Sequence, residues 1–383
     1  PSTRHPPTRN PLNPLISMKL YIIAGEASGD LHGSNLIRAL KTLEGGLQCR
    51  VWGGDLMRDA GGDLVRHYRD LAFMGFWEVL KNLRTILRNL RFCQKDIVAY
   101  KPDALVLIDY PGFNLRIAKW ARQQGIPVIY YISPQIWAWH SSRVHRIKRD
   151  VDEMLVILPF EKAFYAKYGV AAKFVGHPLL DVIPAVSPPP RADRPCDVTL
   201  LPGSRKQEVS RILPVMLSVT PDFPEMRFSI AAAAALPDAF FQPFLTNYPK
   251  VALERGNTYS LLAQSGAALV KSGTSTLETA LIGTPQVVCY AGSPLSFAIA
   301  KRVVNVRYIS LVNLILDRPL LRELIQDELT RTNLKVALGE ILNPEKAGEL
   351  RKGYAELRHL LGDGGASGRA ASIIMDFLKR HKA

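Results

Sequence analysis

The chain has 383 residues, of which 47% are hydrophobic and 22% are charged, a composition typical of a folded two-domain protein rather than a disordered chain. A formal net charge of +15 favours an anionic partner: a nucleic acid, an anionic lipid surface or a phosphorylated substrate. The four cysteines lack the spacing of a zinc site or a disulfide framework, and no apolar run approaches the roughly 18 residues of a membrane-spanning helix.

The first 17 residues are rich in proline and lack periodicity, so we expect a disordered leader before a first domain that spans residues 18–185. Lys19 to Ala24 form the first predicted strand. The turn that follows, GEASGDLHG at residues 25–33, opens a helix at about Leu31. It resembles the first turn of a Rossmann domain in outline but lacks the GxGxxG pattern of dinucleotide-binding proteins.

Three nearly continuous apolar runs, residues 103–109, 127–133 and 153–158, predict strands of a parallel sheet covered on both faces. Strands that alternate with helical segments indicate a doubly wound α/β domain, in which ligands bind at the carboxyl ends of the strands. Asp109 stands at such an end. Its carboxylate is a candidate general base, and the alternative is that it caps the following helix.

Between these strands, residues 71–95 combine apolar residues at helical spacing with a strongly basic complementary face. Only Glu78 is acidic between Phe73 and Gln94. This pattern predicts a helix that lies in a membrane interface, although a soluble amphipathic helix packed on its own sheet would look similar. The residues assigned to the lipid surface are Phe73, Phe76, Trp77, Leu80, Lys81, Arg84, Arg88 and Arg91.

Proline-rich residues 186–195 form the predicted linker to a second domain, residues 196–365. Its first strand leads into Gly203, Ser204 and Arg205, where small residues and a cation at a strand-to-helix turn are suited to bind an anion. The second domain repeats the architecture of the first. We therefore expect two Rossmann-like, doubly wound domains that face each other across a ligand-binding cleft.

A strand at Ala267 to Val270, a turn at Gly273 to Thr276 and a helix at Leu277 to Ile282 form a second candidate phosphate site. Glu278 lies one turn inside this helix, where a carboxylate suits the two hydroxyls of a ribose better than a phosphate. These features predict a nucleotide site. The alternative is an ordinary strand, turn and helix capped by a Ser or Thr of the turn.

Three further helices are predicted at residues 318–329, 343–361 and 366–383. The last two are separated by the glycine-rich residues 362–365. This hinge would let the last helix cross back onto the first domain.

Eight motifs give the chain a close resemblance to lipid-A-disaccharide synthases, which are bacterial glycosyltransferases with two Rossmann-like domains (the GT-B fold). They cover the chain from Met18 almost to its end, in the order typical of that family. The motifs are GEASGD (25–30), IDYPGFN (108–114), YISPQIWAW (131–139), LPFEKAFY (158–165), GHPLLD (176–181), LPGSR (201–205), GTSTLE (273–278) and ISLVN (309–313).

The resemblance implies transfer of 2,3-diacylglucosamine from its UDP conjugate to the 6-hydroxyl of 2,3-diacylglucosamine 1-phosphate, with inversion, to give a β-1,6-linked disaccharide and UDP. It assigns catalysis to Asp109 and Arg205 and implies no cofactor. Because no acidic pair is poised to hold Mg²⁺, we also expect no metal ion. The implied UDP-binding residues are Gly203, Ser204, Arg205, Ser272, Gly273, Thr274, Ser275, Glu278 and Asn313, and the acceptor side comprises Gly25, Glu26, Ser28, Gly29, Asp30 and Asn114.

The expected partners are the two acylated sugars and the inner-membrane lipid surface, so we place the protein in the cytoplasm, peripherally on that membrane. Homo-oligomerisation stays open. Nucleic acid is not expected, because the basic residues alternate with an apolar stripe and no nucleic-acid module is recognised. The alternatives are another UDP-sugar enzyme of this fold, such as a peptidoglycan glycosyltransferase or a sugar epimerase, and a non-catalytic protein that binds anionic lipids.

Overall fold

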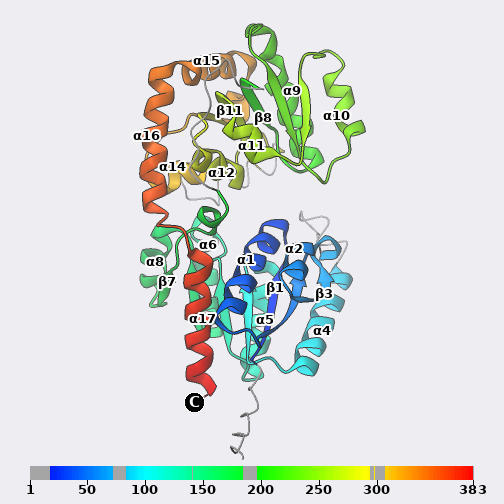
Figure 1. Cartoon of the computed structure of the whole chain (residues 1–383), viewed down its shortest axis with the longest axis vertical. Helices are drawn as coiled ribbons and strands as arrows, with labels where there is room; N and C mark the ends of the chain where they lie inside the picture. Colours follow the sequence, from blue (N-terminus) through cyan, green and yellow to red (C-terminus); the bar gives the residue numbers. More distant parts are fainter. Residues whose placement is uncertain are drawn as a thin grey trace, which may run out of the picture.

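Two α/β domains make up the chain, each built on a parallel sheet (Figure 1). The computed structural model describes residues 18–71, 83–139, 141–183, 196–293, 297 and 307–382. The predicted leader and linker therefore lie outside the described residues, as do five of the predicted lipid-facing residues: Phe73, Phe76, Trp77, Leu80 and Lys81. None of the helices in the described part is both long enough and apolar enough to cross a membrane.

The sheet of the first domain has seven parallel strands in the order β3-β2-β1-β4-β5-β6-β7. The strands are β1 Lys19–Ala24, β2 Gln48–Gly53, β3 Asp63–His67, β4 Ala104–Ile108, β5 Val128–Tyr131, β6 Glu153–Val156 and β7 Ala172–Phe174. The sequence analysis did not predict β3 and β7. Both are short edge strands that are partly exposed, so they lack the continuous apolar run that identifies a central strand.

Helices cover both faces of this sheet, and the side chains of β1 show why. Leu20, Ile22 and Ala24 enter one hydrophobic core, whereas Tyr21 and Ile23 enter another on the opposite face. All five are fully buried. The helices are α1 Ala27–Leu43, α2 Asp55–Asp59, α4 Leu83–Tyr100, α5 Pro111–Gln123, α6 Ile136–Trp139, α7 Val144–Asp150 and α8 Pro159–Ala166.

The sheet of the second domain has six parallel strands in the order β10-β9-β8-β11-β12-β13. The strands are β8 Val198–Leu201, β9 Phe228–Ala232, β10 Ala252–Arg255, β11 Ala267–Lys271, β12 Gln286–Tyr290 and β13 Glu323–Ile325. The helices are α9 Lys206–Ser218, α10 Asp238–Leu245, α11 Thr258–Ala263, α12 Thr274–Ile282, α14 Leu311–Leu316, α15 Arg331–Leu342 and α16 Pro344–Leu360.

In both sheets the strand order reverses at the same relative place, between β1 and β4 and between β8 and β11. The last paired residues there are Ala24 with Ile108 and Leu201 with Val270. Loops that follow such a pair diverge to opposite faces of the sheet and leave a crevice, where doubly wound folds bind their ligands. Each domain therefore provides one candidate ligand-binding crevice, at the carboxyl ends of β1 and β4 in the first domain and of β8 and β11 in the second.

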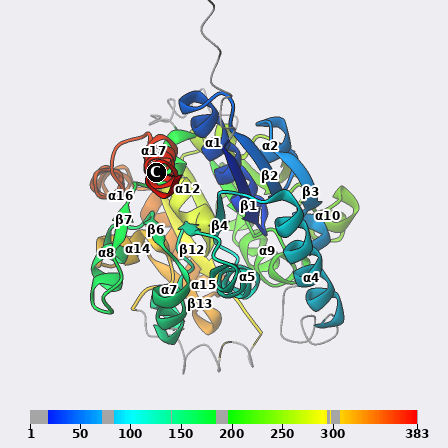
Figure 2. The same ribbon diagram turned by 90° about the horizontal axis from the view of Figure 1, so that it is seen from below.

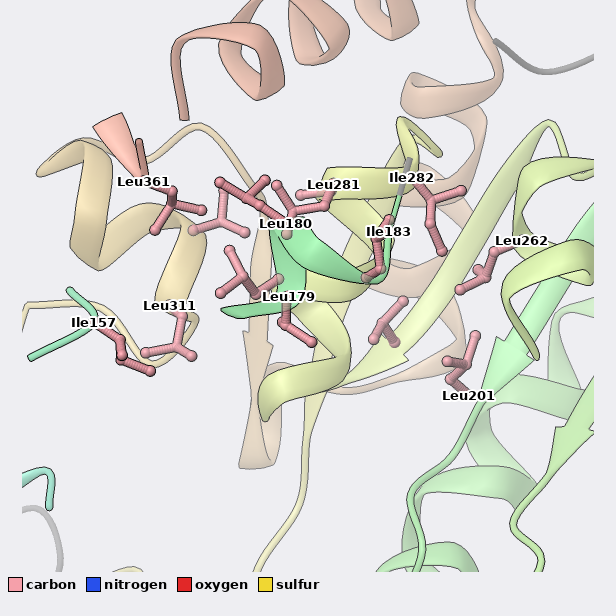
Figure 3. Close-up of a cluster of buried hydrophobic side chains, with 14 of the residues drawn as sticks. Ile157, Leu179, Leu180, Ile183, Leu201, Leu262, Leu281, Ile282, Leu311 and Leu361 are labelled. Carbon is pink, nitrogen blue, oxygen red and sulfur yellow. The ribbon is translucent and has the colours of Figure 1, made fainter. Parts of the chain in front are cut away.

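An apolar junction joins the two domains (Figure 3). Leu179 and Leu180 lie in the 3₁₀ turn η3, Pro178–Asp181, which follows the first sheet, and Ile183 comes directly after it. They belong to the same buried cluster as Leu281 and Ile282 of α12 in the second domain. Close packing of this kind tolerates little displacement, so the junction fixes the two domains relative to each other.

The C-terminal helices also connect the domains. α16 lies along the second domain, and α17, Ala366–Lys382, continues onto the first domain beside α1 (Figures 1 and 2). The Arg358 guanidinium of α16 donates to the carbonyl oxygens of Ile183 and Leu281, at 3.1 and 3.3 Å, one from each domain. The chain thus crosses the junction twice.

The prediction of a helix at residues 318–329 is wrong. The chain forms the edge strand β13 there, parallel to β12, and then the 3₁₀ turn η6, Gln326–Glu328. Gln326 has a φ of 53°, which lies outside the right-handed helical region. Pairing with β12, which is distant in sequence, overrides the local helical pattern.

Asp181 anchors the start of α17 from the first domain. Its carboxylate accepts hydrogen bonds from the backbone N–H groups of Gly365, Ala366 and Ser367 at 2.6, 3.1 and 2.9 Å. We predict that Asp181→Ala lowers the stability of the docked helix by about 0.5–2 kcal/mol, since capping groups contribute on this scale. Hydrogen exchange of the α17 amides should accelerate, and Asp181→Asn, which keeps an acceptor oxygen, should show a smaller change. Unaltered exchange in the Ala variant would refute the capping role.

Candidate functional site

A cleft of about 990 Å³ lies between the two domains, and both sheets contribute its walls. The first domain supplies Glu26, Ser28 and Asp109. The second supplies the turn residues 203–205 and 273–275 together with Glu278. The candidate catalytic residues and most of the candidate donor-site residues, which are far apart in the sequence, therefore open into one cavity.

Asp109 follows the last residue of β4 in a strained backbone conformation. Asp109 and Tyr110 have φ angles of 44° and 50°, in the left-handed region that residues other than glycine seldom adopt. The Asp109 carbonyl oxygen is held by the Tyr130 hydroxyl at 2.6 Å and by the Asn114 side-chain amide at 2.8 Å. These contacts offset a strain of order 1–3 kcal/mol per residue and fix the position of the carboxylate at the cleft.

Burial raises the pKa of Asp109 to about 7, and the negative charge of Glu26 adds to this effect, while a backbone hydrogen bond at Tyr110 opposes it. A carboxylate with this pKa is suited to accept a proton near neutral pH. The alternative role as a helix cap is wrong, because α5 begins at Pro111 after Tyr110 without a side-chain cap.

Glu26 connects the two walls electrostatically. Burial raises its pKa, and the positive charge of Arg205, from the other domain, lowers it. Its neighbour Gly25 must lack a side chain, since a Cβ there would come within 2.2 Å of the Tyr110 ring. The first-domain loop therefore packs against the Tyr110 ring, next to Asp109, and Glu26 interacts electrostatically with both Asp109 and Arg205.

The first turn of the second domain carries the cations. Gly203 has a φ of 113°, which only glycine adopts readily. Arg205 then contacts Glu208 at 3.3 Å, and the same Glu208 oxygen contacts the Lys271 ammonium at 3.0 Å. Gly203, Arg205, Glu208 and Lys271 all line the cleft. An anion bound there could replace the Glu208 carboxylate as the partner of Arg205 and Lys271.

The second anion-binding turn is the start of α12. This helix begins at Thr274, three residues earlier than predicted, and its N-cap is Gly273 without a side-chain cap. The alternative of a Ser or Thr cap is therefore wrong: the Thr276 hydroxyl donates back to the Gly273 carbonyl oxygen at 2.8 Å. Gly273, Thr274 and Ser275 line the cleft, so the N–H groups at the start of α12 are available there to bind a phosphate.

Glu278 projects from the first turns of α12 toward Tyr259 of α11. Burial raises the pKa of Glu278, and a hydrogen bond from the Tyr259 hydroxyl opposes this shift. Both residues line the cleft. A partly buried carboxylate held in this way has acceptor capacity left for the hydroxyls of a ligand.

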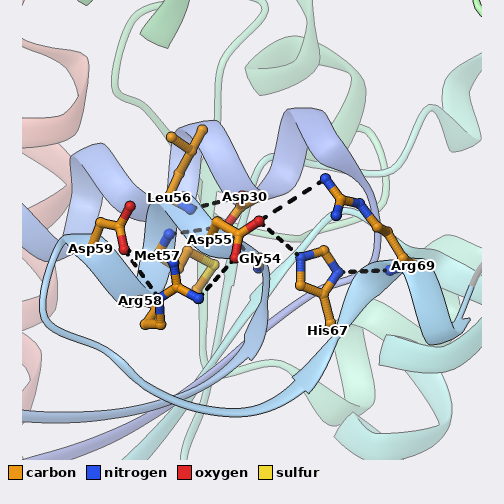
Figure 4. A network of polar contacts seen from close by, with 9 residues as sticks. All are labelled: Asp30, Gly54, Asp55, Leu56, Met57, Arg58, Asp59, His67 and Arg69. Atoms are coloured by element: carbon orange, nitrogen blue, oxygen red, sulfur yellow. Dashed lines mark hydrogen bonds and ion pairs between the residues drawn. The ribbon is translucent and has the colours of Figure 1, made fainter. Parts of the chain in front are cut away.

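Several predicted site residues do not line the cleft. Asp30 instead accepts hydrogen bonds from the backbone N–H groups of Gly54, Leu56 and Met57, and so anchors the start of α2 (Figure 4). Gly29 packs against Ala24 of β1. Gly25 and Asn114 act on the cleft indirectly, through the contacts to Tyr110 and Asp109 described above.

Asn313 and Ser272 likewise support the second domain from behind the cleft. The Asn313 side chain is fully buried and bonds to the Leu321 backbone and to Glu323, both at 2.8–2.9 Å. The Ser272 hydroxyl donates to the Ile309 carbonyl oxygen at 3.0 Å. Asn313, which the sequence resemblance placed at the donor site, therefore does not line the cleft itself.

The cleft residues that the sequence analysis did not assign to the site include Glu208, Lys271, Tyr259 and Arg143. Glu208 stands three residues after Arg205, a helical spacing that could have indicated the ion pair. Lys271 ends a predicted strand, where ligand-binding residues are expected. No local signal pointed to Tyr259 or to the direction of Arg143. No group of three or more His, Cys, Asp or Glu side chains in the described part is arranged to hold a metal ion.

The described part of the predicted membrane helix is α4. Its buried side includes Cys93 and Ile97, which pack into the first domain. Its other side exposes the predicted cations Arg84, Arg88 and Arg91, and with them the apolar side chains of Leu87 and Phe92, which are 46% and 41% exposed. The helix is therefore docked on its own domain and also presents a mixed basic and apolar surface.

The sequence is similar to known proteins over almost its whole length. Residues 20–373 match the family model described as lipid-A-disaccharide synthetase. The lipid-A-disaccharide synthase of Syntrophus aciditrophicus is 42% identical over 378 residues, which cover 95% of this chain and 99% of the relative. That of Geobacter metallireducens is 39% identical over 382 residues, which cover 95% and 98%.

Solved structures confirm the fold. The calicheamicin glycosyltransferase CalG4 superposes with a TM-score of 0.60 at 17% identity, covering 96% of this chain and 99% of that one. The UDP-GlcNAc 2-epimerase of Neisseria meningitidis, bound to UDP-GlcNAc, has a TM-score of 0.55 at 13% identity, covering 95% and 100%. The predicted GT-B architecture is thus correct, and the full-length match to the synthases assigns this chain to the lipid-A-disaccharide synthase family.

Proposed function

We propose that the chain transfers 2,3-diacylglucosamine from its UDP conjugate to the 6-hydroxyl of 2,3-diacylglucosamine 1-phosphate, forming the β-1,6-linked disaccharide 1-phosphate and UDP. The observation that carries this assignment is the single cleft in which Asp109 of the first domain faces Arg205 and Glu278 of the second. The family relationship favours this reaction over another UDP-sugar reaction and over lipid binding without catalysis.

The donor lies against the second domain in this proposal. Arg205, Lys271 and the first N–H groups of α12 bind the diphosphate, while Glu278 binds the ribose hydroxyls. As the bond between the anomeric carbon and the diphosphate breaks, negative charge develops on the leaving oxygen. Fixed cations and N–H groups stabilise that charge in the transition state because they need no reorganisation.

The acceptor lies against the first domain. Asp109 takes the proton of the 6-hydroxyl as its oxygen attacks the anomeric carbon from the side opposite the diphosphate. This arrangement inverts the configuration, and it requires the base and the leaving-group site on opposite walls, as Asp109 and Arg205 are. Glu26 and Ser28 are further acceptor-side contacts in the cleft.

The decisive experiment is incubation with both acylated sugars and mass spectrometry of the product. We predict that Asp109→Asn, which preserves shape but removes the base, lowers turnover by at least about 10²-fold, the scale that a general base contributes. UDP affinity, measured by calorimetry, should stay unchanged because the donor site lies on the other domain. A folded Asn variant with near-full turnover would remove Asp109 from the mechanism.

The pH dependence gives a second test. Because the base must be ionised and its pKa is raised to about 7, kcat/KM should fall as the pH drops below 7 and level off above it. Glu26→Gln removes a nearby negative charge, so the pKa of Asp109 should decrease and the profile should shift to lower pH. A profile that Glu26→Gln leaves in place would show that another group controls the rate.

We also propose that the protein works in the cytoplasm, bound peripherally to the inner membrane, where its acylated substrates reside. The exposed cations and apolar side chains of α4 support this placement, since such a helix attracts anionic lipids and buries apolar surface among them.

For the membrane contact, we predict that replacing Phe76, Trp77 and Leu80 by Ser reduces sedimentation with anionic vesicles but leaves UDP affinity unchanged. A matched control is Val336→Ser on α15, which also alters an exposed apolar side chain but lies in the second domain. Equal losses of vesicle and UDP binding in the triple variant would identify a core helix instead.

A further inference from the structure

The acceptor of the proposed reaction carries a phosphate monoester, whose charge is about −1.5 to −2 at neutral pH. The first-domain wall of the cleft places two carboxylates, Glu26 and Asp109, where this anion must approach. Among the described residues of the first domain that line the cleft, Arg143 is the single cation. It is therefore the group available to balance the acceptor's charge on this wall.

The cations of the opposite wall are already engaged. Arg205 and Lys271 share one oxygen of Glu208, at 3.3 and 3.0 Å, and in the proposed function they bind the donor's diphosphate. A second phosphate at the same cations would meet strong repulsion from the first. The acceptor phosphate accordingly needs a separate partner.

The environment of Arg143 is that expected of an anion-binding side chain. It ends the 3₁₀ turn η2, Ser141–Arg143, directly before α7, which packs against α5. Its side chain is partly buried, yet it makes no ion pair or hydrogen bond within the described residues. A partly desolvated guanidinium without a partner is unfavourable, and an anion would relieve this penalty.

The surroundings of Arg143 are positive as well as desolvated. Burial lowers the pKa of this guanidinium, and the charges of Arg146 and Arg116 lower it further. Both neighbours are exposed and also lack an ion pair in the described part of the chain. Three cations thus create a local positive potential at one end of a wall that otherwise bears carboxylates.

Arg143 also lies close to the catalytic centre. Tyr130, whose hydroxyl donates to the Asp109 carbonyl oxygen at 2.6 Å, interacts electrostatically with both Asp109 and Arg143. Asp109 and Arg143 also line the same cleft, so an acceptor bound against this wall can turn one end to the base and the other to the guanidinium. This orientation matches an acceptor that reacts through C6 and is phosphorylated at C1.

We propose that Arg143 binds the acceptor's 1-phosphate, with Arg116 and Arg146 strengthening the local positive potential. This assignment rests on the proposed function and adds to it the group that recognises the phosphorylated acceptor. The planar guanidinium can bind two phosphate oxygens at once and so directs the 6-hydroxyl to Asp109.

The test compares two acceptors, 2,3-diacylglucosamine with and without its 1-phosphate. The unchanged protein should prefer the phosphorylated acceptor in kcat/KM. Arg143→Ala should lose about 10- to 150-fold on that acceptor, the range of a charged hydrogen bond, but less than about 3-fold on the other. Arg143→Lys should recover part of the loss, since it restores the charge without the planar fork. Lys119→Ala on α5, an exposed cation outside the cleft, serves as the matched control.

Three results would overturn the assignment. Equal losses on both acceptors would mean that Arg143 supports the fold, and a parallel loss of UDP affinity would place it in the donor site. Loss of vesicle sedimentation with no change in acceptor preference would assign it to lipid headgroups.

A second measurement is the equilibrium binding of the two acceptors in the presence of UDP, which gives the acceptor preference without turnover. A protein that binds the phosphorylated acceptor through Arg143 yet forms no disaccharide would contradict only the proposed reaction.

Discussion

The apolar junction between the domains is the constraint on which the rest depends. Leu179, Leu180 and Ile183 are buried against α12, and each such side chain contributes about 1.5–3 kcal/mol when removed from water. Because the two sheets are held this way, their carboxyl ends face one cavity. Neither domain alone could place a base opposite a leaving-group site. The proposed reaction therefore depends on the junction as well as on the catalytic residues.

Charge balance in the cleft follows from this arrangement. Each wall combines carboxylates with cations: Glu26 interacts electrostatically with both Asp109 and Arg205, and Glu208 forms ion pairs with Arg205 and Lys271. The raised pKa of Asp109 arises from burial and from Glu26, so the same crowding that makes the carboxylate costly to ionise makes it a suitable base near neutral pH. Backbone strain at Asp109 is a further cost, and the hydrogen bonds from Tyr130 and Asn114 offset it.

Much of the fold was predictable, because central parallel strands are continuous apolar runs and the turns that follow them carry the polar residues. Local patterns were a poor guide where contacts with distant segments decide the structure or the direction of a side chain. Residues 323–325 became an edge strand by pairing with β12, against the helical pattern around them. Asp30 looked like a ligand-binding residue in a glycine turn, but its side chain points to the start of α2. Asn313, which the family resemblance placed at the donor site, instead makes hydrogen bonds within its own domain.

The sequence by itself determined the fold class, the positions of the central strands and the family, since each depends on local periodicity or on ordered motifs. The tertiary structure alone decided that Asp109 and Arg205 share a cleft, that Glu208 pairs with Lys271, and that Arg143 faces the site. The physical reason is that a side chain's role depends on its direction and on neighbours supplied by distant segments. Those are set by packing between sheets, helices and domains, which no short stretch of sequence encodes.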